Sequence, residues 1–137
     1  MNIIKFPFEL GTHYEDWELD LEILPDRVPY YDSYLYVGVE VHIFLNNHTN
    51  KTELVYNCDS LVAAVLTFKI RNSSYREMLG KLSESDSKPL TRVSNDVLLN
   101  YFFINSFYVT IRIGDGKQYL IYTSNYSLLT SLLSSLI

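Results

Sequence analysis

The chain has 137 residues, of which 47% are hydrophobic and 15% aromatic, and its formal net charge is −5. This length suits one domain with a real hydrophobic core, and the low glycine and proline content excludes a disordered or linker-rich chain. The acidic balance argues against electrostatic binding to nucleic acid or to an anionic membrane. No run approaches the ~20 apolar residues of a membrane helix, and the first eight residues lack the pattern of a signal peptide.

The single cysteine, Cys58, can form no disulfide within the chain. Its strand-like neighbours predict a buried, inert thiol. One unpaired cysteine is typical of a reducing compartment. We therefore expect a cytoplasmic protein.

The first part of the chain favours short strands. Residues 3–10 favour an edge strand that ends at Gly11 and is weakened by its proline. From Trp17 to Ile23, hydrophobic residues alternate with acids, which predicts a half-buried strand with an acidic outer face. Prolines at positions 25 and 29 bracket the turn that follows.

The longest regular pattern runs from Tyr34 to Leu45, where aliphatic residues occupy every second position. This period of two predicts one long central strand whose odd-numbered residues face the core. A polar loop at residues 46–50 marks its end, and residues 53–57 then return antiparallel.

The middle of the chain is ambiguous in places. Asp59 or Ser60 can cap a helix over Leu61–Leu66, which the neighbouring alanines favour, although a strand as far as Ile70 remains open. Ser74 and Glu77 have the spacing of a capping box, which predicts a helix over residues 75–82, and residues 83–89 have the composition of a loop. A further helix from Val97, capped by Ser94, is predicted by helical spacing, but a strand over residues 97–104 fits as well.

The clearest local signal is a β-hairpin near the C-terminus. Two β-rich runs, residues 107–113 and 118–123, flank the turn Gly114-Asp115-Gly116, and Asp-Gly is the strongest short-range hairpin signal. If Asp115 and Gly116 form the loop, Arg112 faces Tyr119 and Ile111 faces Leu120 across the pair.

The chain ends in a predicted amphipathic helix, capped by Ser124 or Asn125, with a leucine stripe that runs to Ile137. Runs of strands with segregated helices predict one α+β domain over residues 1–137. We expect a mainly antiparallel sheet of about five strands, with about three to four helices packed on one face. The opposite face would then be open to a partner.

No motif of a nucleophilic, phosphate-binding or metalloprotease site occurs in the sequence. The three histidines, at positions 13, 42 and 48, have no zinc-site spacing, so we expect no catalytic residue, no metal and no cofactor. Two alternatives stay open. One is a small-molecule-binding protein or enzyme with a pocket between sheet and helices, lined by Tyr36, His42, Tyr108 and Tyr119. The other is an adaptor that dimerises through a sheet edge or the terminal helix.

Acidic residues are concentrated near the N-terminus. Residues 9–40 hold nine acids and one base, net −8, whereas the remainder holds seven acids and ten bases, net +3. The same stretch is rich in tyrosine and holds Trp17, side chains that often anchor protein interfaces. The acids either prevent unwanted pairing of an edge strand or complement a basic partner. The candidate partner-binding residues are Glu15, Asp16, Glu18, Asp20, Glu22, Asp26, Tyr34, Tyr36 and Glu40.

This profile resembles the small immunity proteins of bacterial toxin systems, including contact-dependent growth inhibition. Those proteins are typically acidic, single α+β domains without catalytic motifs, and each binds one cognate toxin and blocks its active site. The resemblance is one of type across the whole chain, and no residue is carried over by a motif. It implies a non-enzymatic, cytoplasmic inhibitor whose one partner is a basic toxin, most simply a nuclease, with no direct contact to nucleic acid or membrane.

Overall fold

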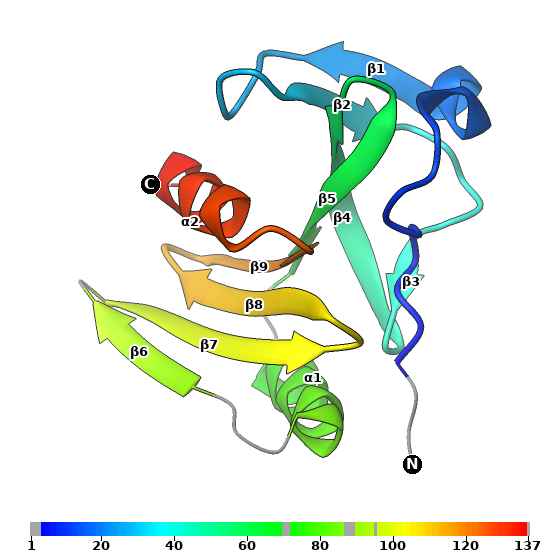
Figure 1. Cartoon of the computed structure of the whole chain (residues 1–137). Helices are drawn as coiled ribbons and strands as arrows, with labels where there is room; N and C mark the ends of the chain where they lie inside the picture. The colour runs from blue at the N-terminus through cyan, green and yellow to red at the C-terminus, as the bar shows by residue number, and fades with distance from the viewer. Residues whose placement is uncertain (1–3, 70–71, 87–89, 95, 137) are drawn as a thin grey trace.

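The structure is a computed structural model that describes residues 4–69, 72–86, 90–94 and 96–136. Within these ranges one antiparallel sheet of nine strands has the order β1-β2-β4-β5-β9-β8-β7-β6, and the short β3 pairs with β4 beside this path (Figure 1). The strands are β1 (Leu21–Leu24), β2 (Asp32–Tyr36), β3 (Ile43–Phe44), β4 (Asn47–Asn57), β5 (Ser60–Phe68), β6 (Leu90–Ser94), β7 (Val97–Ile104), β8 (Phe107–Gly114) and β9 (Lys117–Thr123). The helices are the 3₁₀ turns η1 (Tyr14–Asp16) and η2 (Glu18–Asp20), and the α-helices α1 (Asn72–Ser85) and α2 (Tyr126–Ser135).

The two faces of the sheet are covered by different helices (Figure 1). Leu128 and Leu132 of α2 share one core cluster with Val65 of β5, on what we name the α2 face. Met78 of α1 shares the second cluster with Leu66, the next residue of β5, on the α1 face. Successive side chains of a strand point to opposite faces, so β5 supplies both cores.

The predicted proportions of the fold are wrong. Strands make up 48% and helices 22% of the structure, with nine strands and two α-helices in the described ranges instead of about five strands and three to four helices. The helices also lie on both faces and not on one. The physical reason is that the central strands are apolar on both sides, so each face needs its own cover.

The long strand predicted from Tyr34 to Leu45 is also wrong. β2 ends at Tyr36, a loop follows, and β3 is only two residues long. In the two strands the large rings of Tyr36 and Phe44 are buried, whereas the aliphatic Val39 between the strands is 82% exposed. Aromatic rings remove more apolar surface from water than valine does, and this outweighs the aliphatic alternation.

Both segments that are predicted as helices with a strand as the alternative form strands. They are Leu61–Leu66 and Val97–Ile104. β5 lies between β4 and β9, and β7 lies between β6 and β8. Because β5 is apolar on both faces, it shows no clean period of two, and packing overrides the helix propensity of its alanines. The alternative prediction of a strand is therefore the correct one for both segments.

The predicted hairpin and the two remaining helices are confirmed. Asp115 and Gly116 turn β8 into β9 with positive φ angles of 53° and 74°, and Arg112 pairs with Tyr119 as expected. Helix α2 follows Asn125, whose side chain accepts a hydrogen bond of 3.1 Å from the Leu128 N–H. Helix α1 includes residues 75–82 but begins at Asn72, so Ser74 lies inside it and the predicted cap is wrong. At its other end α1 extends to Ser85 and takes the start of the predicted loop at 83–89. Residues 87–89 and Ile137 lie outside the described ranges.

The N-terminal segment crosses the α1 face. An edge strand was predicted at residues 3–10, but residues 4–10 form none, and residue 3 lies outside the described ranges. Phe8 is buried in the core of the α1 face. Its backbone N–H and C=O bond to the Tyr122 hydroxyl instead of to a neighbouring strand. In the described ranges, no helix is long and apolar enough to cross a membrane.

Candidate functional site

Strand β1 forms one edge of the sheet, and two 3₁₀ turns lead into it. Trp17 lies between these turns and packs its ring against Phe8 and Tyr36, with centroid distances of 5.0 and 5.8 Å. The strand predicted from Trp17 therefore begins only at Leu21. With Trp17 held against the core, the acids on either side of it are directed toward solvent.

The acidic candidates stand at or near this edge. Glu15, Asp16, Glu18 and Glu22 are exposed and Asp20 is half-buried, while Asp26 and Glu40 are exposed on the loops that follow β1 and β2. Among the described residues the salt bridges are Arg27–Glu53, Lys51–Glu53 and Arg112–Asp115, and none of them uses these acids. Their charges are therefore available to another molecule.

Large apolar side chains are exposed beside the same acids. Leu19, between Glu18 and Asp20, is 95% exposed, and Ile23 on β1 is 81% exposed. Exposed apolar groups gathered in one region, with polar residues around them, mark interaction sites on protein surfaces. We name this set the β1 surface, and it consists of Glu15, Asp16, Glu18, Leu19, Asp20, Glu22 and Ile23.

The two tyrosine candidates differ from the acids. Tyr34 is half-buried against the rings of Tyr14 and Tyr56, and burial together with the nearby Asp32 carboxylate raises its pKa. Tyr36 is only 8% exposed and belongs to the core of the α1 face, so it cannot contact a partner. The alternation of β2 decides this, because it places Tyr34 and Tyr36 on the same side of the strand, toward the core of the α1 face.

Cys58, His42 and His48 lie at or near the turns of two β-hairpins. Cys58 is exposed in the turn between β4 and β5 with a φ of 56°, so the predicted burial of its thiol is wrong. The turn places it beyond the last residue of β4. The rings of His42 and His48 stack at 5.7 Å on the β3–β4 hairpin. Within the described ranges, no group of three His, Cys, Asp or Glu residues is placed to hold a metal ion.

The four residues of the alternative pocket do not come together. Tyr36 lies in the core of the α1 face and His42 is exposed on a loop. Tyr108 and Tyr119 are on the α2 face but line separate hollows, of about 190 Å³ and 640 Å³. The structure therefore contains no single pocket built from this set.

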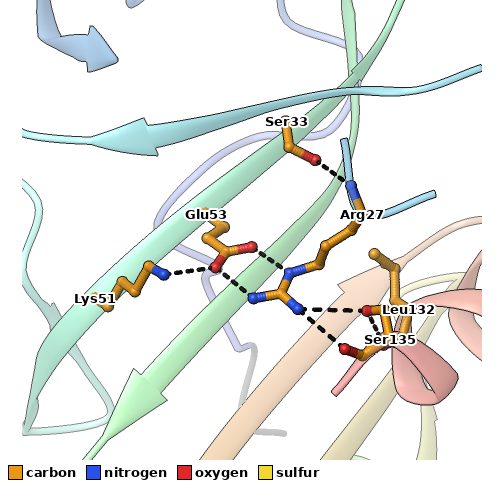
Figure 2. Close-up of polar contacts among 6 residues, drawn as sticks. All are labelled: Arg27, Ser33, Lys51, Glu53, Leu132 and Ser135. Carbon is orange, nitrogen blue, oxygen red and sulfur yellow. Dashed lines mark hydrogen bonds and ion pairs between the residues drawn. The ribbon is translucent and has the colours of Figure 1, made fainter. Parts of the chain in front are cut away.

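A buried ion pair, which the sequence did not reveal, fastens the loop after β1 (Figure 2). Arg27 donates from Nε and Nη2 to the two carboxylate oxygens of Glu53, at 2.5 and 2.6 Å, and from Nη1 to the Ser135 carbonyl at 3.4 Å. Lys51 approaches the same carboxylate at 3.0 Å. Burial acts to raise the pKa of Glu53, but the hydrogen bonds from Arg27 and Lys51 outweigh it and the pKa is lowered. The available signal was a charged residue, Glu53, directly before the apolar run Leu54-Val55-Tyr56.

In the described ranges the protein is an antiparallel nine-stranded sheet with an α-helix on each face. One edge of this sheet is acidic and partly apolar. Comparisons with protein-family models, characterised proteins and solved structures found no match to this chain. The function is therefore argued from the residues of the surface.

Proposed function

We propose that this chain is a non-enzymatic inhibitor that binds one basic bacterial toxin, a nuclease, in the cytoplasm and blocks its active site. The β1 surface is the proposed interface. The observation that carries this proposal is the position of acids that form no ion pair with the described residues, next to Leu19 and Ile23, which are 95% and 81% exposed.

The two kinds of side chain have complementary roles in such an interface. Burial of apolar surface contributes about 25 cal/mol per Å². Charges on the rim speed the encounter with an oppositely charged protein and fix its orientation. Because Glu18 and Glu22 have no ion-pair partner within the described residues, binding to lysine or arginine of another protein breaks no internal pair.

The competing interpretation is that the acids only protect an edge strand from unwanted pairing. β1 is an edge strand of four residues, and Glu22 suits that role. Protection alone, however, would not place Ile23 at 81% exposure on the same strand. An exposed apolar side chain at the edge favours association, so Ile23 supports a binding surface, although Glu22 points to the other side of β1.

The choice of a nuclease follows from charge. A nuclease needs a basic groove for its phosphate backbone. Carboxylates spaced along an extended edge suit such a groove, and they would compete with the substrate. The acids at positions 15 to 22 are suited to this because they follow one another along η1, η2 and β1.

The test is a pull-down from the source organism with the full chain as bait and the product of the adjacent gene included. The double variant carries Glu18→Lys and Glu22→Lys. The control is Glu77→Lys, which changes an exposed acid of α1. Capture of one basic protein that is weakened by high salt and lost only in the double variant supports the proposal. Undiminished capture by the double variant contradicts it, as does self-association through β1 with no other partner.

A further inference from the structure

A second charged feature lies on the α2 face. It is an open hollow of about 640 Å³ where the end of β5 meets the start of β9. Four basic side chains line it, those of Arg27, Lys51, Lys69 and Lys117, and the acid among its lining residues is Glu53. Four positive charges and one negative charge leave a net +3, in a chain whose total is −5.

The sheet register brings these residues together from three separate strands. Lys51 of β4 pairs with Thr67 of β5, which pairs with Tyr119 of β9, so these three stand in one row on one face. Lys69 follows the last residue of β5, and Lys117 is the first residue of β9. Because the two strands are antiparallel, their two lysines lie at the same end of the sheet.

The acid in the hollow is already neutralised. The Glu53 carboxylate accepts from Arg27 and is paired with Lys51 (Figure 2). Asp115, the acid of the adjacent turn, pairs with Arg112 at 3.4 Å. Lys69 and Lys117 are both exposed, and neither forms an ion pair with the described residues. Two ammonium groups therefore remain for an external anion.

We propose that this hollow binds a small organic phosphate of the size of a nucleoside diphosphate. Its volume lies within the range of about 300–1,000 Å³ of small-ligand sites, and lysine binds phosphate as a point charge. A long nucleic acid is disfavoured, because the residues outside the hollow sum to a net charge of −8, the total of −5 less the +3 of the hollow, which opposes a polyanion that continues past it. The hollow and the β1 surface share no residue, so this proposal and the inhibitor proposal stand or fall separately.

The test is calorimetric titration of the full chain at low salt with pyrophosphate, ADP, adenosine and a short RNA oligonucleotide as probes. The variant is Lys69→Glu with Lys117→Glu. Its control is Lys5→Glu with Arg76→Glu, which makes the same charge change at two exposed residues, one in the N-terminal segment and one on α1. Thermal melts of all three proteins establish that they fold alike.

We expect saturable binding of one ADP or one pyrophosphate per chain, weakened about tenfold or more in the hollow variant and by less than about twofold in the control. Equal loss in both variants, or no binding by the unaltered protein at millimolar probe, overturns the proposal. Binding of adenosine as tight as that of ADP overturns it too. Tighter binding of an RNA oligonucleotide than of ADP would identify the hollow as part of a nucleic-acid site instead.

Discussion

The hydroxyl of Tyr122 donates to the Phe8 carbonyl at 2.7 Å and accepts from the Phe8 N–H at 2.9 Å. A side chain of β9 thus satisfies both backbone groups of a residue 114 positions away in the sequence. Buried backbone groups need such partners, and Phe8 lies before the point where the N-terminal segment pairs with β5, at Gly11 and Thr12. Tyr122 therefore supplies the partners of Phe8 on the α1 face.

Replacement of Tyr122 by phenylalanine should destabilise the protein. The change leaves the N–H and C=O of Phe8 without partners in the core, and each unsatisfied buried group costs about 1–3 kcal/mol. Urea unfolding should show a free energy of unfolding lower by roughly 2–4 kcal/mol. Tyr126→Phe, at an exposed tyrosine, is the control and should change little. Equal stability of the two variants would mean that the segment is held by packing alone.

Tyr56 offers the opposite case. Its hydroxyl is buried and has no hydrogen-bond partner among the described residues, so Tyr56→Phe should leave stability at neutral pH unchanged or raise it by up to about 1 kcal/mol. Burial, with a smaller effect of the Asp16 carboxylate, raises the pKa of Tyr56 to about 12.

The raised pKa predicts the alkaline behaviour. The pKa of Tyr56 in the folded state lies above the unfolded value of about 10, so the folded state favours the neutral hydroxyl. The resulting stabilisation of the fold is complete below pH 10 and is lost as the pH rises toward 12. Stability should therefore fall above about pH 10, and less steeply in the Tyr56→Phe variant. Parallel pH profiles of the two proteins, from denaturant titrations, would contradict this assignment.

Removal of Arg27 should expose the cost of burying Glu53. In Arg27→Met the carboxylate, only 3% exposed, keeps Lys51 as its remaining partner, so we expect a loss of about 2–4 kcal/mol at neutral pH. The pKa of Glu53 is lower in the folded protein than in the unfolded chain. The ionised, paired carboxylate therefore stabilises the fold at pH values above its pKa in the unfolded chain. This stabilisation is lost as the pH falls through its pKa in the folded protein. The stability of the variant should consequently decline less in acid. Arg92→Met, at an exposed arginine, is the control, and an equal loss there would exclude the ion pair as the cause.

Two glycines should respond in opposite directions to alanine. A Cβ at Gly38 would lie 2.4 Å from the hydroxyl oxygen of Tyr36, whose ring is buried, so Gly38→Ala should destabilise by about 1–3 kcal/mol. A Cβ at Gly80 of α1 would meet no atom within 4 Å, so Gly80→Ala should stabilise by about 0.5–1 kcal/mol. Thermal melts measure both. A stabilising Gly38→Ala would show that the loop after β2 relaxes freely.

The exposed isoleucine of β1 should affect binding without affecting stability. Ile23→Ser should weaken capture of the proposed partner about tenfold or more, since it removes apolar area at the interface. Val93→Ser, on the opposite edge strand β6 at 74% exposure, is the matched control and should leave capture unchanged. Both variants should unfold at the same denaturant concentration as the unaltered protein. Equal effects on capture would place the interface elsewhere.

The sequence by itself determined the β8–β9 hairpin and helix α2, because their signals are local. Asp115 and Gly116 adopt positive φ angles within one turn, and the Asn125 side chain caps a helix that starts beside it. The concentration of acids between residues 9 and 40 was equally visible in the sequence. That most of them would be exposed, and would form no ion pair with the residues that the structure describes, could not be read from it.

Tertiary structure decided the rest. β5 is a strand because it is buried on both faces, which removes the period of two that would have identified it. Tyr36 points inward because its ring packs against Phe8 and Trp17, two residues from a segment far away in the sequence. Glu53 is charged and buried because the loop after β1 brings Arg27 across β4. Each outcome depends on contacts between distant residues, and no local pattern encodes such contacts.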